Sequence, residues 1–351
     1  SGTGTEGTDY STISDITITA GATTGTASFT PTDDNVYEGN ETGIVAIDTV
    51  SGGSANESGT PQVVTITITE NESAPTVTLA TSATSIAENA GSSLTLTATL
   101  SVATTADVTV SLDGTGGTGT EGTDFGTVSD ITITAGATTG TTSFTPTDDS
   151  IYDATSNETG GISISAVSGG SATEDGNQAV TITITDNESA PTVTLSRSSS
   201  AIDENSGSTV TITATLSVVT FQDVTISIDG TGGTGTEGTD FGTVSDITIS
   251  AGATTGTAAV DPTDDSVYEG DETAGVSISG VSGGGASESG SQSVTVTITE
   301  NESAPTVTLT SSASSIVENA GSSLTLTATI SQVADEDVTV TIGTAGTSTE
   351  G

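Results

Sequence analysis

The chain repeats one long unit, and this repetition constrains its fold more than any other sequence feature. The pentapeptide Thr-Glu-Gly-Thr-Asp begins at Thr5, Thr120 and Thr236, so its copies lie 115 and 116 residues apart. A second marker, Asn-Glu-Ser-Ala-Pro, begins at Asn71, Asn187 and Asn301, with spacings of 116 and 114 residues. A repeat of this length is a whole domain, so the chain is predicted to be a tandem array of modules.

The markers divide the chain into four repeats, numbered here in chain order. Residues 73–188 and 189–302 are predicted to be complete domains, residues 1–72 the C-terminal part of a domain, and residues 303–351 the N-terminal part. A proline precedes the first strand of each later repeat (Pro75, Pro191 and Pro305). Proline is tolerated at a strand start and stiffens the junction, so successive domains are expected to form a semi-rigid rod.

Apolar residues alternate with threonine throughout each repeat. In the second repeat Leu94, Leu96, Ala98 and Leu100 alternate in this way, and further such runs lie at residues 77–79, 108–112, 131–133, 162–164, 180–184 and around Phe144. A period of two places the apolar side chains on one face of a strand, and threonine tolerates the solvated face. Seven short strands separated by glycine-rich turns predict an all-β fold, a tandem array of seven-stranded immunoglobulin-like antiparallel β-sandwiches.

The charge balance excludes several classes of partner. The chain carries 46 Asp and Glu against one basic residue, Arg197, and has no His and no Cys. Nucleic acid and anionic membrane surfaces therefore find almost nothing to bind, and no apolar stretch is long enough for membrane insertion. Self-repulsion of this size favours bound counter-ions, for which divalent cations are the obvious candidates. The polar, lysine-free composition suits an extracellular or cell-surface protein.

Acidic residues recur at four positions of the repeat. The first is the glutamate of the pattern Ile-x-Glu-Asn-x-Gly, the second an aspartate before an aromatic residue, the third a run that begins with Thr-Asp-Asp, and the fourth the end of the last strand. In the same order, these acidic residues are Glu88, Glu204 and Glu318; Asp9, Asp124 and Asp240; Asp33, Asp34, Glu38, Glu41, Asp148, Asp149, Asp153, Glu158, Asp264, Asp265, Glu269 and Glu272; and Glu70, Asp186 and Glu300.

These motifs, in this order, resemble those of the Calx-β domain, which is known from sodium–calcium exchangers, integrin subunits and many microbial surface proteins. The resemblance covers the whole chain and rests on Gly-Thr-Asp-Tyr/Phe, on Thr-Asp-Asp-x-x-Tyr-Glu-Gly-x-Glu-Thr, and on a closing Thr-Ile-Thr-Glu/Asp-Asn-Glu. It implies a seven-stranded sandwich that holds Ca²⁺ in loops at one end, next to the neighbouring domain, and it makes the acidic residues at the four positions candidate ligands. Ca²⁺ takes six to eight oxygen ligands, which agrees with this carboxylate set.

Two features leave alternatives open. The second repeat has a two-residue insertion and an Asp in place of Glu at residues 152–158, so its site is expected to be weaker or differently coordinated. Solvated loop charge is the alternative interpretation of all the acidic positions. Six Asn-x-Ser/Thr sequons, at Asn40, Asn56, Asn71, Asn157, Asn187 and Asn301, leave glycans open as partners.

The sequence argues against an enzyme, because catalysis would rest on carboxylates alone and three near-copies of one acidic pattern are unlike an active site. The favoured function is a structural subunit of an extracellular, calcium-stabilised fibre or stalk. The alternatives are a surface adhesin or binding module and a calcium-sensing regulatory domain.

The two partial repeats suggest how such subunits join. Residues 1–72 are predicted to hold the last four strands of a domain, and residues 303–351 the first three, the third of them near Val338–Ile342. Each piece alone leaves strand edges unpaired, whereas two chains joined head to tail would complete a sandwich and form an open homopolymer. The alternative is that the sequence is a window of a longer tandem array, in which each piece meets its missing half in the same chain.

Overall fold

The computed structural model describes residues 2–153, 158–318 and 321–346. The chain divides into two compact units, the first formed by Ser1–Asp149 with Asn157–Asn187 and the second by Ser150–Ser156 with Glu188–Gly351. The predicted sequon at Asn157 and much of the predicted insertion lie outside the described residues. No helix in the described part of the chain is long and apolar enough to cross a membrane.

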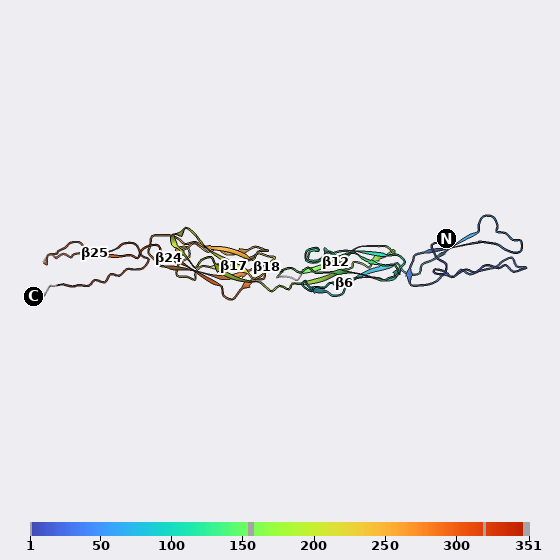
Figure 1. Cartoon of the computed structure of the whole chain (residues 1–351), viewed down its shortest axis with the longest axis horizontal. Helices are drawn as coiled ribbons and strands as arrows, with labels where there is room; N and C mark the ends of the chain where they lie inside the picture. The colour runs from blue at the N-terminus through green and yellow to red at the C-terminus, as the bar shows by residue number, and fades with distance from the viewer. Residues whose placement is uncertain (1, 154–157, 319–320, 347–351) are drawn as a thin grey trace. The chain divides into compact units, whose positions relative to one another are not determined.

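The first unit contains one complete β-sandwich, built from the second repeat. One sheet has the strand order β10-β6-β4-β13 and the facing sheet the order β5-β14-β12-β8-β9; β6 and β12 mark the two layers in Figure 1. The strands are β4 (Thr76–Thr81), β5 (Ser85–Ala87), β6 (Leu94–Leu100), β8 (Val108–Asp113), β9 (Ile131–Ile133), β10 (Thr139–Phe144), β12 (Glu158–Ser168), β13 (Thr173–Glu174) and β14 (Ala179–Thr185).

The period-two alternation decides which side chains enter the core. Leu96, Ile131, Ile162 and Ile182 come from four strands and are fully buried. The threonines between them point to the other face, as the pleat of a strand requires. The seven predicted strands are confirmed, and so is the all-β sandwich class.

The edges of the sheets differ from the antiparallel prediction. The central pairs are antiparallel, but the short strand β5 pairs in parallel with β14, and β13 pairs in parallel with β4. The chain leaves β4 and joins the opposite sheet as β5, so β5 runs beside the last strand of the repeat rather than beside its own neighbour in sequence.

The second unit repeats this architecture with the third repeat. Its sheets have the orders β21-β17-β15-β23 and β16-β24-β22-β19-β20, and Figure 1 labels β17, β18 and β24 in this unit. The elements are β15 (Thr192–Arg197), β16 (Ala201–Asp203), the 3-10 turn η1 (Glu204–Ser206), β17 (Val210–Leu216), β18 (Val219–Thr220), β19 (Val224–Asp229), β20 (Ile247–Ile249), β21 (Thr255–Val260), β22 (Glu272–Ser282), β23 (Ser287–Glu288) and β24 (Ser293–Thr299).

The first and fourth repeats form fewer strands than predicted. The first repeat contains β1 (Val36–Tyr37), β2 (Glu41–Ala46) and β3 (Val63–Ile68), and the fourth contains β25 (Val307–Ser311) and β26 (Leu326–Ile330). The strand predicted near Val338–Ile342 is absent, and residues 1–72 lack two of the four predicted strands, the counterparts of β9 and β10, at residues 16–18 and 24–29. Their counterparts β8, β9 and β10 pair with strands from the other part of the repeat, so within the described chain these segments have no ladder to join.

In each acidic loop, a short segment made of an apolar residue and a tyrosine pairs through its backbone with the repeat that follows. β1 pairs in parallel with β7 (Ala103–Thr104), and β11 (Ile151–Tyr152) pairs in parallel with β18. In the third repeat the Tyr268 N–H donates to the Val333 carbonyl at 2.9 Å. The same loop therefore carries acidic side chains and a backbone pairing.

An aromatic pair packs against a glycine beneath the acidic loops. The rings of Phe125 and Phe144 lie 4.8 Å apart between centroids, and a Cβ on Gly160 would lie 2.5 Å from the Phe144 ring. The third repeat has Val260 and Ala274 at the positions of Phe144 and Gly160, and both are fully buried. The second repeat thus combines the large Phe144 ring with a glycine, whereas the third repeat combines the smaller Val260 with an alanine.

This match makes a double-mutant prediction. Gly160→Ala is expected to destabilise the second repeat by about 1–3 kcal/mol through overpacking. Adding Phe144→Val should recover part of that loss, because it recreates the pair found in the third repeat. Urea unfolding of the wild type, both single variants and the double variant measures the coupling energy. Additive losses would contradict the proposed packing.

Candidate metal centre

Carboxylates from separate segments of the third repeat meet in one cluster. Three groups have ligand oxygens within 4.8 Å of one another, and they share Glu204 and Glu269. The groups are Glu204, Asp265 and Glu269; Glu204, Glu300 and Glu302; and Asp240, Glu269 and Glu272. The shared members join all three groups into one continuous set of oxygen donors.

The second acidic position is held by a turn that is anchored in the core. The Thr236 N–H donates to Asp240 Oδ2 at 2.5 Å, which closes the turn around the carboxylate. The next residue, Phe241, is fully buried and forms a β-bridge with Pro262. Because Pro262 begins the Thr-Asp-Asp run, this bridge brings the second and third acidic positions together.

Glu204 is the buried member of the cluster, with 7% of its surface exposed. It begins the η1 turn, and the Asp265 N–H donates to its Oε1 at 3.1 Å. Burial raises the pKa of Glu204; the hydrogen bond from Asp265 opposes this, and the charges of Glu300, Asp265 and Asp264 add to it. A carboxylate in this position favours a cation that offsets burial and repulsion.

Glu300 organises the loop that follows the Thr-Asp-Asp run. Its Oε2 accepts the N–H of Glu269 at 2.6 Å and of Gly270 at 3.0 Å, and its Oε1 accepts the N–H of Glu302 at 2.8 Å. Burial opposes ionisation of Glu300, but these donors lower its pKa to about 2. The hydrogen bond that Glu302 shares with Glu300 raises the pKa of Glu302 to about 7.

The remaining two glutamates, Glu269 and Glu272, lie close to other negative charges. Burial, followed by the charges of Asp240 and other acidic neighbours, raises the pKa of Glu269 to about 6 and that of Glu272 to about 7. Asp335 of the fourth repeat contributes to both shifts. The cluster consists of carboxylate oxygens, and Arg197 is the one basic residue of the sequence. Oxygen donors are the ligands that Ca²⁺ prefers.

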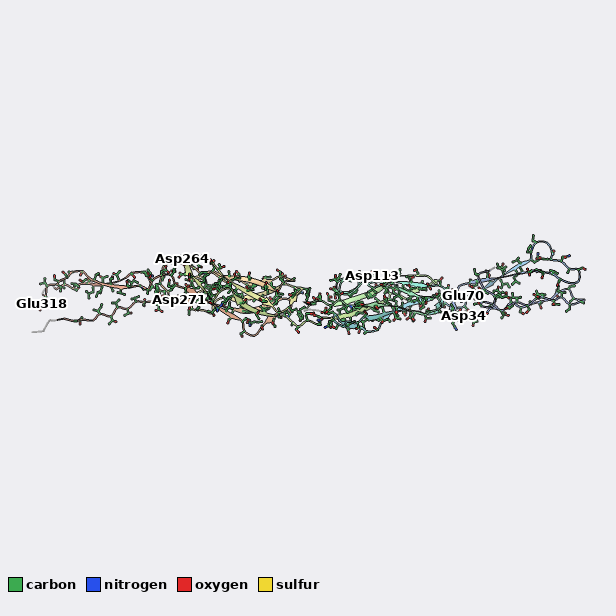
Figure 2. The ribbon with its side chains drawn as sticks, viewed as in Figure 1. Asp34, Glu70, Asp113, Asp264, Asp271 and Glu318 are labelled. Atoms are coloured by element: carbon green, nitrogen blue, oxygen red, sulfur yellow. The ribbon has the colours of Figure 1, made fainter. Side chains whose placement is uncertain are left out.

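The first repeat has part of the same arrangement. Asp9, Glu38 and Glu41 have ligand oxygens within 4.8 Å of one another. Glu70 Oε2 accepts the N–H of Glu38 at 2.6 Å and of Gly39 at 2.7 Å, as Glu300 does for its loop. Figure 2 shows Glu70 beside the acidic loop of this repeat.

The second repeat shows only part of the arrangement. Glu88, Asp186 and Glu188 each offer an oxygen within 4.8 Å of the others, and the Asn187 N–H donates to Glu88 Oε1 at 3.3 Å. The Thr120 N–H donates to Asp124 Oδ2 at 2.6 Å, as in the third repeat. Within the described ranges, none of the other predicted ligands of this repeat joins such a group; these are Asp124, Asp148, Asp149, Asp153 and Glu158.

Five further predicted ligands lie outside the described groups, and one of them is Glu70, which accepts the N–H groups of Glu38 and Gly39. Asp33 and Asp264 accept the side-chain amides of Asn71 and Asn301 at 3.0 and 3.2 Å, and Asp34 accepts the N–H of Val36 at 2.8 Å. Glu318 is exposed in the fourth repeat, away from Asp264 and Asp271 in Figure 2. These side chains support the loops or stand apart rather than joining the described clusters.

Sequence reasoning missed two members of the third-repeat environment. Glu302 belongs to the cluster, and its signal was present in the closing Glu-Asn-Glu motif, two residues after Glu300. Asp335 acts from another repeat, where its N–H donates to the Tyr268 carbonyl at 3.3 Å. No motif marks Asp335, since the other repeats have Thr105 and Phe221 at its position.

Comparison with known proteins identifies the repeat. The family model of the Calx-beta domain matches residues 1–72, 70–188 and 186–302. No curated protein matches the chain.

Three solved structures illustrate the similarity. The crystal structure of CBD12 from CALX1.2 is 14% identical, covers 64% of this chain and 100% of its own, and has a TM-score of 0.29. The apo-form Calx CBD1 domain is 19% identical over 32% of this chain and 99% of its own, at a TM-score of 0.27. Invasin, described as a bacterial integrin-binding protein, is 19% identical over 72% of this chain and 45% of its own, at a TM-score of 0.32.

The raised pKa values predict how the metal-free protein responds to pH. Glu269 and Glu272 have folded pKa values of about 6 and about 7, above the usual 4.5. Between pH 4.5 and 7 the folded state therefore binds more protons than the unfolded state, so stability should fall as pH rises. Glu300, with its lowered pKa, acts only below pH 4.5, where its contribution is lost on acidification.

Thermal unfolding of the metal-free chain at a series of pH values tests this. The expected optimum lies near pH 4.5, and Glu272→Gln should flatten the decline toward neutral pH. A transition temperature that rises between pH 5 and 7 would contradict the assignment.

Proposed function

Because the chain belongs to the Calx-beta family, we propose that it is a calcium-stabilised structural array that serves as an extracellular fibre or stalk. In this proposal, domains bounded as the sequence repeat predicts, 73–188 and 189–302, are joined in series, and each acidic cluster binds Ca²⁺. The proposed role of the array is to expose its two ends, and it catalyses no reaction.

The acidic cluster of the third repeat is the observation that carries calcium binding. Seven carboxylates form overlapping groups with oxygens within 4.8 Å, and one of them, Glu204, is buried. Raised pKa values at Glu269 and Glu272 reflect burial and crowding of like charge, which a bound divalent cation would relieve. The residues of this cluster therefore fit a calcium ion, with Glu204, Asp240, Asp265, Glu269, Glu272 and Glu300 as its proposed ligands.

A structural role is favoured over catalysis. The whole chain has no His, no Cys and no Lys, so any acid–base chemistry would fall to carboxylates. The same carboxylate positions recur along the chain, as expected for sites that stabilise each domain in turn. We therefore propose that the protein is not an enzyme.

The exposed side chains favour a stalk over a carbohydrate-binding adhesin. Of the nine aromatic residues, Phe221 is the exposed one, at 45%. Stacking on sugar rings needs exposed aromatic faces, which this chain scarcely offers. The chain has 46 acidic residues and one basic residue, Arg197, so nucleic acid and membranes are excluded from the proposed partners. Self-association is the interaction that we propose first.

Self-association has support in the first and fourth repeats. Their apolar side chains are exposed, whereas the same positions of the complete repeats form cores. Exposed apolar side chains grouped in this way are consistent with the proposed self-association. In the proposed fibre, partial repeats of this kind meet their missing halves, either between neighbouring chains joined head to tail or within a longer tandem array.

Calcium titration of the full chain tests the proposal. Saturating Ca²⁺ should stabilise each occupied domain by on the order of 1–3 kcal/mol, given dissociation constants of about 10⁻⁴–10⁻³ M for extracellular modules. Thermal unfolding in calcium and in chelator measures the shift, and calorimetry gives the stoichiometry.

A matched pair of variants assigns the effect to the cluster. Glu204→Gln should lose most of the calcium-induced shift of its domain, because a buried ligand is replaced by a neutral amide. Asp261→Asn removes the same charge from an exposed position outside the groups and should keep the shift. Equal transition temperatures with calcium and chelator would overturn calcium binding.

A further inference from the structure

The third repeat contains a dipeptide that occurs once in the sequence. Asp261 is followed by Pro262, and no other aspartate of the chain precedes a proline. Thr30 and Thr145 stand at the position of Asp261 in the first and second repeats, and a proline follows each of them. The repeat therefore does not require a carboxyl group at this position, and the aspartate is a specific feature of the third repeat.

The Asp261–Pro262 bond lies where β21 ends and the acidic loop begins. Val260, the last residue of β21, is fully buried, whereas Asp261 is exposed. Among the described residues, none donates a hydrogen bond to the Asp261 carboxyl group. The side chain can therefore rotate toward its own backbone carbonyl, and solvent reaches the same bond.

A fixed backbone donor polarises the carbonyl of Asp261. The Gly242 N–H donates to the Asp261 carbonyl oxygen at 2.8 Å. Gly242 follows Phe241, which is fully buried and forms the β-bridge with Pro262, so the donor and the acceptor lie on two segments that are held together. A donor held at a carbonyl oxygen stabilises the negative charge that develops there when a nucleophile adds to the carbon.

We propose that Asp261 cleaves its own peptide bond to Pro262 in mild acid. A carboxylate oxygen of Asp261 attacks the carbonyl carbon of the same residue and forms a cyclic anhydride. The bond from this carbon to the proline nitrogen breaks, and the nitrogen keeps the electron pair and takes a proton from the acidic solvent. One water molecule then opens the anhydride, which leaves Asp261 as a free carboxyl terminus and Pro262 as a free secondary amine.

The other two repeats have the same geometry without the nucleophile. The Ser11 N–H donates to the Thr30 carbonyl and the Gly126 N–H to the Thr145 carbonyl, both at 2.9 Å. A proline follows in each case, and its nitrogen, which carries no hydrogen in the peptide, leaves as a basic secondary amine. Threonine has no carboxylate to form the anhydride, so these two bonds are stable. The reaction at Asp261 occurs once per chain and on the chain itself, which is compatible with a structural protein.

Strand pairing holds the two products together. Cleavage leaves β15 to β21 on one fragment and β22 to β24 on the other. β22 pairs with β19, and β24 pairs with β16, so both sheet contacts cross the cut. The third repeat therefore stays folded after cleavage, and its acidic loop is attached to the rest of the domain at one end only.

Intact-mass measurement of the full chain after incubation in mild acid tests the cleavage, at a pH where circular dichroism shows the native fold. The wild type should yield fragments 1–261 and 262–351, whereas Asp261→Thr, which recreates the residue of the other two repeats, should stay intact. Asp261→Glu keeps the charge but should cleave about tenfold or more slowly, because its longer side chain closes a less favourable ring. An intact wild type, or equal cleavage of Asp261→Thr, overturns the proposal.

Two engineered bonds, each placed in the Asp261→Thr background, test the role of the fold. Thr145→Asp places the dipeptide beside the Gly126 donor, and Ala74→Asp places it before a proline where no backbone N–H of the described residues donates to the carbonyl. Thr145→Asp should cleave about tenfold or more faster than Ala74→Asp, as expected for one donor to the developing oxyanion. In urea at the same pH the two rates should converge. Equal rates in the native chains would show that the Gly126 type of donor plays no part.

Gel filtration of the cleaved wild type tests whether the domain stays assembled. The two fragments should elute as one species in native buffer and as two in urea, because strand pairing across the cut is the only link between them. Separation in native buffer would contradict this part of the proposal. None of these measurements involves calcium, so their outcome leaves the proposed calcium binding to be judged by its own experiment.

Discussion

Strand pairing between the N-terminal and the C-terminal part of each repeat is the constraint on which the rest of the structure depends. Every sheet of the complete sandwiches joins strands from both parts, as β6 does with β10 and β8 with β9. Where only one part is present, the same sequence pattern yields an exposed, unpaired segment, as at Val338–Ile342. A strand is stabilised by its ladder of backbone hydrogen bonds and by its covered face, and both come from residues distant in sequence.

The acidic cluster is a consequence of that pairing. Buried aromatic residues such as Phe241 hold the turns that carry the carboxylates, and bridges such as that to Pro262 join one loop to the next. Backbone N–H groups then fix Glu300, while Glu269 and Glu272 are left crowded by like charge. The packed sandwich thus stabilises the domain, whereas the carboxylates of its loops repel one another, and a divalent cation would relieve this repulsion.

Much of the fold and part of the site could be predicted from the sequence. The period-two alternation identified the seven strands and their buried faces, since it depends only on local geometry. The acidic motifs identified Glu204, Asp240, Asp265, Glu269, Glu272 and Glu300, which the structure brings together. The parallel edge strands β5 and β13 were not predicted, because strand direction at an edge depends on which sheet the chain enters. Asp335 was not predicted either, because it acts on the cluster from another repeat.

The sequence by itself determined the repeat, the all-β class, the Calx-beta family and the four acidic positions, because each is written in local pattern and spacing. Only the tertiary structure decided which acids converge, that Glu88 and Glu204 are buried while Glu318 is exposed, and that three predicted strands of the first and fourth repeats do not form. The physical reason is the same in each case. Burial, repulsion and strand pairing are properties of residues that meet in space, and a linear pattern specifies a residue's own face but not its partner.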